Sequence, residues 1–282
     1  MRTTTIHIVI VGLTCLAACE WNSDSPRNDA STQPRLDGRV AMPDADDIDA
    51  DPTVLRHLLL TEVVMTPPGS EFIEITNPNA TDISLADYYL ADTGEYWKLP
   101  AGAPTINISD FIVKFPAGAM ITGGASITVA TGTAALFTTA YGSAPTYSIA
   151  DSTVTKTVVP GTPTLTDAGE IMVLCHWDGA AALVSDVDMM IVGMPTQANG
   201  VVSKSGMALG AGTYATDANT IQSQTATPGS GFSTKRQLAE ANHETQAGTG
   251  NGLDGDDETS EDTRMTWDST FIAPTPGTAP TL

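Results

Sequence analysis

Between residues 57 and 193, apolar and polar residues alternate in short runs that end at Gly, Pro or Asn. Period-two alternation is typical of a strand with one buried face, and the closing residues are typical of turns. In the run Ala182–Val192 the apolar side chains fall on one face: Leu183, Val187, Met189 and Ile191. Asp186 and Asp188 are therefore predicted to point away from that face.

The same pattern predicts strands along the whole of this region. They are Leu58–Met65, Glu71–Thr76, Ile83–Leu90, Phe111–Phe115, Ser126–Ala130, Thr146–Ile149, Glu170–Trp177 and Ala182–Val192. No long segment has the 3.6-residue period of an amphipathic helix, and only Gln237–Thr245 suits a short one. Short strands separated by turn residues predict an all-β sandwich.

Three of the predicted strands carry a motif. Their sequences are Leu60-Thr61-Glu62-Val63, Glu71-Phe72-Ile73-Glu74-Ile75-Thr76-Asn77 and Leu85-Ala86-Asp87-Tyr88-Tyr89-Leu90. This region resembles the opening of a lamin-tail domain. Later elements of the family pattern follow in order: Phe115-Pro116-Ala117-Gly118, Gly123-Gly124 and Asp178-Gly179. The resemblance implies an immunoglobulin-like β-sandwich, which in bacteria occurs on secreted and surface proteins.

The chain departs from the compact family domain in several places. Glu95–Ser109 and Thr131–Thr164 are longer than that domain needs, and the residues beyond Gly193 are an extension. Tyr88 stands where the family commonly has Trp, a change that does not disturb packing. We therefore predict an immunoglobulin-like sandwich with long loops and a C-terminal extension.

The first residues have the character of an export signal. Arg2 precedes an apolar stretch, Ile6–Leu13, that is shorter than the ~20 residues of a membrane-spanning helix. Leu16-Ala17-Ala18-Cys19 follows and resembles the lipobox of bacterial lipoproteins. The resemblance implies cleavage before Cys19 and a lipid anchor on its thiol, made durable by more than one acyl chain. The alternative is an ordinary signal peptide cut near Ala18.

The segment that follows the lipobox lacks apolar periodicity and ends in a run rich in Asp, so it cannot bury enough surface to fold. Glu20, rather than Asp, comes after Cys19, which favours the outer over the inner membrane. The predicted parts are a lipoprotein signal peptide (residues 1–18), a disordered acidic tether (19–56), a lamin-tail-like sandwich (57–193) and an extension with an acidic loop (194–282). The extension is expected to pack on the sandwich or to complete it.

The chain is strongly acidic, with 33 Asp and Glu residues, 12 Lys and Arg residues and a net charge of −21. Such a chain would repel nucleic acid, whose binding depends on neutralising phosphates. Once the signal peptide is removed and Cys19 is acylated, Cys175 is the one thiol left, so no disulfide can form within the chain. Its apolar neighbours in sequence indicate a buried structural thiol.

The densest group of carboxylates lies toward the C-terminus: Asp254, Asp256, Asp257, Glu258, Glu261 and Asp262. Ca²⁺ binds about six to eight oxygen ligands, often in loops rich in carboxylates and Gly. The spacing is not that of an EF-hand, because Thr259 and Met265 occupy the sixth and twelfth positions counted from Asp254. The segment is a candidate Ca²⁺ site, with a solvated acidic loop as the alternative, and no cofactor is expected to be required.

Catalytic motifs are absent from the sequence. His57, His176 and His243 are isolated, and neither a Cys-x₂-Cys metal spacing nor a Gly-x-Ser-x-Gly elbow occurs. Glu71 and Glu74 are interpreted as parts of the architecture rather than as a catalytic pair. Asn77, before Pro78, is predicted to hold a turn through its side chain.

The sequence therefore predicts a non-enzymatic binding or structural module at the cell envelope, whose partner is an unidentified envelope protein or glycan. Trp97, Trp177 and Trp267 are predicted to pack in the core, with a sugar- or peptide-binding platform as the alternative. The alternative function is a secreted hydrolase-type enzyme, or an enzyme accessory, with its site in Glu95–Ser109 or Thr131–Thr164.

Overall fold

The computed structural model describes residues 57–166, 169–193, 202, 204–217, 226–237, 250–268, 270 and 272–281. The chain divides into two units, Met1–Asp49 and Ala50–Leu282, and every described residue belongs to the second. Cys19, the predicted tether and nearly all of the predicted helix Gln237–Thr245 lie outside the described residues. None of the described helices has the length and apolar character needed to cross a membrane.

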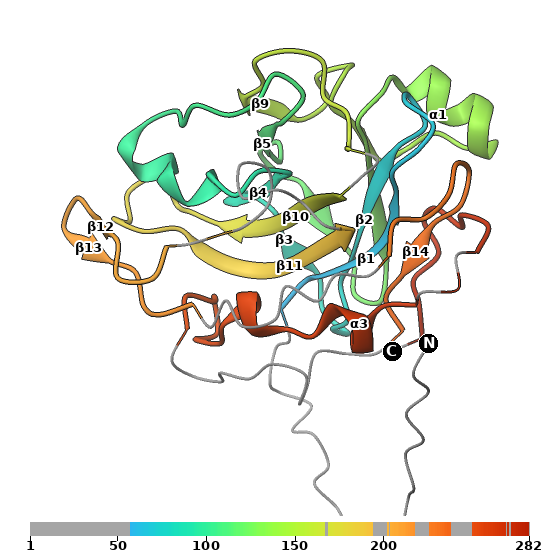
Figure 1. Ribbon diagram of the computed structural model, residues 1–282. Helices are drawn as coiled ribbons and strands as arrows, with labels where there is room; N and C mark the ends of the chain where they lie inside the picture. The colour runs from blue at the N-terminus through green and yellow to red at the C-terminus, as the bar shows by residue number, and fades with distance from the viewer. Residues whose placement is uncertain are drawn as a thin grey trace, which may run out of the picture. The chain divides into compact units, whose positions relative to one another are not determined.

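Two five-stranded sheets form the second unit (Figure 1). In order, the first sheet contains β14 (Thr234–Lys235), β1 (Leu59–Val64), β2 (Phe72–Thr76), β7 (Ser126–Ala130) and β8 (Tyr147–Ser148). The second contains β11 (Ser185–Gly193), β10 (Gly169–His176), β4 (Tyr88–Ala91), β5 (Ile112–Lys114) and β9 (Thr155–Val158). Neighbouring strands are antiparallel except for the parallel pair β7 and β8.

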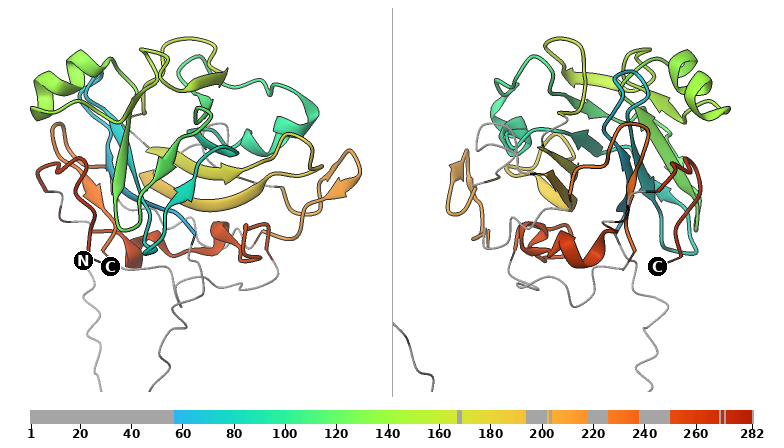
Figure 2. Two further views of the ribbon diagram at one scale, coloured as in Figure 1. Left: turned by 180° about the vertical axis from the view of Figure 1, so that it is seen from behind. Right: turned by 45° about the vertical axis from the view of Figure 1, so that its right-hand side comes forward.

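Smaller elements lie between these strands. The short ribbons are β3 (Ile83–Ser84) with β6 (Met120–Ile121), and β12 (Ala208–Leu209) with β13 (Gly212–Thr213). The described helices are η1 (Tyr96–Ala101), α1 (Ala134–Tyr141), η2 (Glu258–Ser260) and α3 (Thr263–Thr266). The segment that contains η2 and α3 runs along β11 (Figure 2).

The two sheets pack face to face around one hydrophobic cluster. Its fully or almost fully buried members come from both sheets: Val63, Ile73, Val129, Leu90 and Leu174. Inward side chains from two antiparallel sheets, interleaved along each strand with outward ones, define a β-sandwich. The predicted all-β, immunoglobulin-like fold is confirmed.

Each sheet is also covered on its outer face. Over the second sheet, Tyr89 and Val173 pack with Trp97 of η1 and with Tyr214 of the C-terminal region. Over the first sheet, Phe72 meets Phe137 of α1 edge to face, and Figure 2 shows α1 standing beside β2. These covers explain why β1 and β2 are buried along their whole length rather than at every second residue.

Most predicted strands lie where the pattern places them, and β7 has the predicted bounds. The run Ile83–Leu90 divides into β3 and β4, because the backbone turns where Tyr88 N donates to the Leu85 carbonyl oxygen. The pattern did not predict β9 and β14. Both are edge strands that are short and mostly polar, so they lack the alternation that marks a half-buried strand.

The long loop Thr131–Thr164 contains α1, which the pattern also did not predict. The Thr133 side chain accepts a hydrogen bond from Leu136 N at the start of the helix, and Gly142 ends it with a φ of 78°. The helix buries a single side chain, Phe137. One buried position produces no helical periodicity in the sequence.

Candidate functional site

The motif glutamate Glu71 holds the ends of the loop Thr131–Thr164. It is fully buried and accepts hydrogen bonds from Thr131 Oγ1 and Thr164 Oγ1, both at 2.7 Å, and from Leu165 N at 3.1 Å. A buried carboxylate must be compensated by donors, and these three donors are the two end residues of the loop and the residue that follows it. The structural interpretation of Glu71 is therefore confirmed.

Glu62 and Glu74 hold the C-terminal residues against the first sheet. Thr275 N donates to Glu62 Oε1 at 3.0 Å, and Gly277 N donates to Glu74 Oε2 at 2.6 Å. Burial is the main cause that raises the pKa of Glu74 to about 7. Glu74 therefore acts as an anchor for the backbone, not as half of a catalytic pair.

Asn77 organises the turn after β2, as its sequence context predicts. Its Oδ1 accepts from Asn79 N at 3.0 Å, and its Nδ2 donates to the carbonyl oxygens of Thr81 and Ile121. A Cβ atom on Gly123 would lie 2.3 Å from the Ala80 carbonyl oxygen, so only glycine fits there. The role of these residues is therefore to hold the turn.

The prediction for β11 was wrong about Asp186 and Val187, which do not lie on the faces predicted for them. Leu174 pairs with Asp188 and Cys175 pairs with Asp186, so Val187 bulges out of the ladder. A bulge shifts the alternation by one residue. Asp186 therefore faces the outer side, as Met189 does, whereas Asp188 faces the inter-sheet side, away from Met189 as predicted. Both aspartates are fully buried. For the same reason Val187 and Met189 lie in different clusters and do not share a face.

Asp188 is paired with a buried arginine. Arg236 Nη2 lies 2.8 Å from Asp188 Oδ1, Arg236 Nη1 lies 2.7 Å from Glu261 Oε1, and Arg236 Nε donates to the Leu60 carbonyl oxygen at 2.8 Å. The guanidinium group also lies 5.2 Å from the ring centroid of Trp267. This ion group joins β1, β11 and the acidic segment (Gly250–Asp262) in the interior of the sandwich.

Asp186 belongs to a second buried ion group. Lys204 Nζ lies 2.7 Å from Asp186 Oδ2 and 3.0 Å from Asp217 Oδ1, and all three side chains are fully enclosed. Tyr96 donates its hydroxyl to Asp186 Oδ1 at 2.6 Å. Burial opposes the charge on Lys204, but the two carboxylates outweigh it and raise its pKa. Neither ion group could be found from sequence spacing, because its members lie in separate segments.

The acidic segment adds to the edge of β11. Asp186 N donates to the Asn251 carbonyl oxygen and Leu253 N donates to the Asp186 carbonyl oxygen, so the backbone lies parallel to the strand. Asp257, Glu258 and Glu261 are at most 3% exposed. The alternative, a solvated acidic loop, is therefore wrong for these three residues, whereas Asp254 is exposed.

The six predicted Ca²⁺ ligands serve different ends in the structure. Asp257 Oδ1 accepts from Thr259 N, Glu261 pairs with Arg236, and Asp262 pairs with Arg264. Asp256 N donates to Asp254 Oδ1 at 3.4 Å, a contact that involves the backbone of Asp256 and not its carboxylate. Only Asp254 and Glu258 face a common centre with a further ligand residue. Binding of Ca²⁺ by the six stays a prediction.

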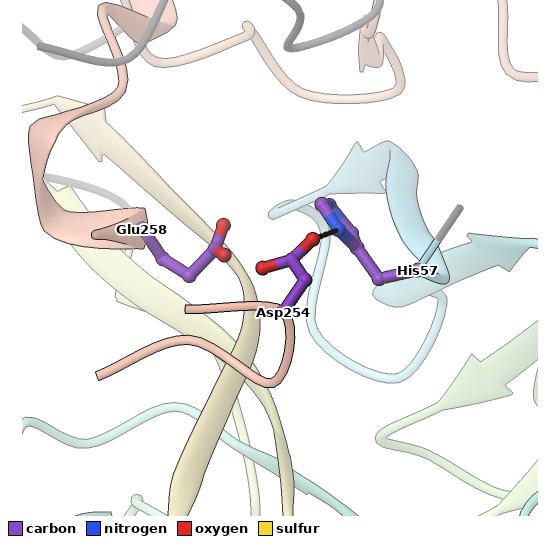
Figure 3. Close-up of side chains that lie close together, drawn as sticks. All are labelled: His57, Asp254 and Glu258. Carbon is purple, nitrogen blue, oxygen red and sulfur yellow. Dashed lines mark hydrogen bonds and ion pairs between the residues drawn. The ribbon is translucent and has the colours of Figure 1, made fainter. Parts of the chain in front are cut away.

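That further residue is His57, at the start of the described domain (Figure 3). Ligand atoms of His57, Asp254 and Glu258 lie within 4.8 Å of one another, and His57 Nδ1 is 2.9 Å from Asp254 Oδ2. The hydrogen bond from His57 lowers the pKa of Asp254. Sequence reasoning treated His57 as isolated, because 197 residues separate it from Asp254. One imidazole nitrogen and two carboxylates make a ligand set suited to a divalent transition metal.

Comparison with known families identifies the sandwich as a member of a described family. Residues 52–188 match the family described as Lamin Tail Domain. The chain contains a lamin tail domain. The crystal structure of a DUF4876 family protein from Bacteroides thetaiotaomicron is similar at 12% identity and a TM-score of 0.36, over 81% of this chain and 72% of that chain. No curated protein matches the chain.

Two of the three tryptophans among the described residues pack inside the lamin tail domain and the segments on it, as predicted: Trp97 is 5% exposed and Trp267 is 1% exposed. Trp177 is half-buried and lines a depression of about 410 Å³ between the β10–β11 turn, the end of η1 and the β12–β13 turn. The other lining residues are small or apolar, including Gly179 and Leu209. Trp177 is thus the tryptophan that a ligand could reach.

The remaining candidate residues are structural or lie outside the described residues. Cys175 is fully buried, and burial raises the pKa of its thiol, so it is the inert thiol that was predicted. His176 packs edge to face on Tyr88. The loops Glu95–Ser109 and Thr131–Thr164, which were proposed for an enzymatic site, contain neither His nor Cys.

Proposed function

We propose that this chain is a bacterial lipoprotein whose lamin tail domain is held at the cell envelope by lipid on Cys19. The observation that carries the proposal is the order of its parts. An apolar stretch ends in Leu-Ala-Ala-Cys, the acidic tether without apolar periodicity (residues 19–56) follows, and the lamin tail domain comes next. The outer membrane is favoured because Glu20, not Asp, follows Cys19.

The domain itself is proposed to act as a non-enzymatic binding or structural module. The two buried glutamates of its β2 motif, Glu71 and Glu74, are engaged in holding loop ends and the C-terminal residues. The partner would be an envelope protein or a glycan, with the half-buried face of Trp177 as the contact surface. Strong negative charge speaks against nucleic acid.

Replacing Cys19 with alanine is expected to move most of the protein from the membrane fraction to the soluble fraction of a cell lysate. The substitution removes the thiol that would receive the lipid and leaves the lamin tail domain unchanged. Fractionation and metabolic labelling with a radioactive fatty acid would measure the effect. Cys175→Ala is the control, because that buried thiol cannot be the lipid attachment site, and it should stay labelled in the membrane. A labelled, membrane-bound Cys19→Ala protein would refute the proposal.

A divalent cation bound by His57, Asp254 and Glu258 is a second proposed activity. The observation that favours it is the approach of the three ligand atoms to within 4.8 Å of one another. Because imidazole nitrogen suits Zn²⁺ better than Ca²⁺, Zn²⁺ is the first ion to test and Ca²⁺ the second. A bound ion would tie the start of the lamin tail domain to the acidic segment.

Zn²⁺ at about a hundred times its Kd is expected to raise the melting temperature by roughly 5–10 °C. Asp254→Asn should abolish the rise. Asp262→Asn, in the same segment but paired with Arg264, is the matched control and should keep it. A melting temperature that neither Zn²⁺, Ca²⁺ nor a chelator changes would exclude the site.

A further inference from the structure

Lys204 is held in contact with two carboxylates in a site closed to solvent. Its Nζ lies 2.7 Å from Asp186 Oδ2 and 3.0 Å from Asp217 Oδ1, and the three side chains have no exposed surface. The ring of Tyr96 lies 5.8 Å from Nζ, and the surrounding cluster is apolar and aromatic. Lysine is almost never buried this completely unless it is paired, and here two carboxylates pair with it.

The two carboxylates have different surroundings. Asp217 accepts from Lys204 N at 3.1 Å and from Asn251 Nδ2 at 2.7 Å in addition to Lys204 Nζ. These donors fix the Asp217 carboxylate with Oδ1 at 3.0 Å from the amine nitrogen, within reach for accepting a proton and returning it. Asp186 receives the Tyr96 hydroxyl on Oδ1 and the amine on Oδ2. A donor fixed on one oxygen polarises the carboxyl carbon toward a nucleophile.

We propose that Lys204 and Asp186 join in an intramolecular amide bond. The ammonium first passes a proton to Asp186 Oδ2, and the free amine adds to Cγ of the neutral carboxyl group. Asp217 takes a proton from the nitrogen and delivers it to Oδ2, which leaves as water. The C–N bond forms, the C–Oδ2 bond breaks, Asp217 ends as it began, and no oxidant or other reactant is needed. Tyr96 donates to Oδ1, which bears the negative charge in the intermediate and becomes the amide oxygen.

The site favours this condensation for two physical reasons. Contact between the reacting groups replaces a bimolecular encounter, which is a large part of the barrier in solution. In water the separate ions are stabilised by hydration, but here they are enclosed, and the amide removes the buried charges of Lys204 and Asp186. The Asp217 carboxylate keeps the hydrogen bonds from Lys204 N and Asn251 Nδ2. The bond would fasten β11 to the segment that carries β12 and β13.

The neighbouring ion group provides an internal comparison. Asp188, two residues along β11, is enclosed with Arg236 in the same way. A guanidinium group keeps its proton at any ordinary pH and is not a nucleophile, so no amide is expected there. Of these two enclosed ion groups, the lysine group is the one whose cation can become a nucleophilic amine.

Mass spectrometry of the purified full chain tests the proposal. The measured mass of the wild-type chain should be lower by one water molecule than the mass calculated for the same chain, with the same lipid, without the bond. A protease digest should contain the peptide of Lys204 joined to the peptide of Asp186. Lys204→Arg should show the full mass and two separate peptides, while Asp217→Asn should form the bond more slowly. Because the wild-type digest is decisive alone, a variant that fails to fold does not affect the result. Separate wild-type peptides with intact Lys204 and Asp186 would overturn the proposal.

Discussion

Replacing Arg236 with methionine is expected to lower the free energy of unfolding by about 3–5 kcal/mol. Its side chain is fully buried and donates to Asp188, Glu261 and the backbone of β1. Methionine keeps much of the packing volume but leaves two carboxylates in the interior without this cation. Equilibrium denaturation in urea would measure the change.

Arg264→Met is the matched control for this substitution. The Arg264 side chain is 62% exposed and pairs with Asp262 at the surface, where an ion pair contributes about 0–1 kcal/mol. Adding Asp188→Asn and Glu261→Gln to Arg236→Met should recover part of the loss, because neutral amides do not need a cation. If Arg236→Met unfolds at the wild-type urea concentration, the buried ion group does not stabilise the domain as argued.

The second large effect concerns pH. The wild-type protein is expected to become less stable as the pH rises from about 5 to about 9, with Glu170 as a main cause. Burial raises the pKa of Glu170 from 4.5 to about 8. A carboxyl group with a raised pKa holds its proton more tightly in the folded state. Its contribution to stability is complete below about pH 4.5 and is lost as the pH rises through about 8. The shift corresponds to a free energy on the order of 4–5 kcal/mol.

Glu170→Gln should remove much of this loss. Glutamine stays neutral at high pH and can still accept the hydrogen bond that Thr166 N donates to Glu170 at 3.0 Å. The charge of Glu170 also raises the pKa of Asp92, after burial, so the substitution relieves that group as well. The variant should therefore be the more stable protein at pH 9 and close to wild type at pH 5. Glu74, whose pKa is raised to about 7, leaves a residual dependence.

Urea denaturation of wild type and variant at the two pH values would measure this difference. Glu95→Gln, an exposed change before η1, is the control and should leave the pH profile of stability as it is. A wild-type stability that does not fall between pH 5 and pH 9 would show that Glu170 is not buried in the way the structure has it.

Much of the sandwich could be predicted from local sequence. The strand β7 and the turn at Asn77 follow from alternation and from turn residues that act within a few positions. The motif glutamates could be interpreted as architecture, but not which loop each would hold. Glu71, for instance, is bonded to Thr164 across 93 residues.

The candidate sites could not be predicted in the same way. The bulge at Val187 depends on how β11 pairs with β10, and it places Asp186 and Asp188 on opposite faces of the sheet. His57 meets Asp254 across 197 residues, and Arg236 meets Asp188 across 48. No local spacing reports such contacts, because they exist only after the C-terminal segment has packed along β11.

The sequence by itself therefore determined the all-β class and the lamin-tail motif, since each depends on residues next to one another in the chain, and the proposed lipid anchor rests on the local run that ends at Cys19. The tertiary structure decided which charged groups are buried together. A buried charge is tolerated only beside its counter-charge, and the partners of Asp186, Asp188 and Glu261 come from distant segments that folding brings together.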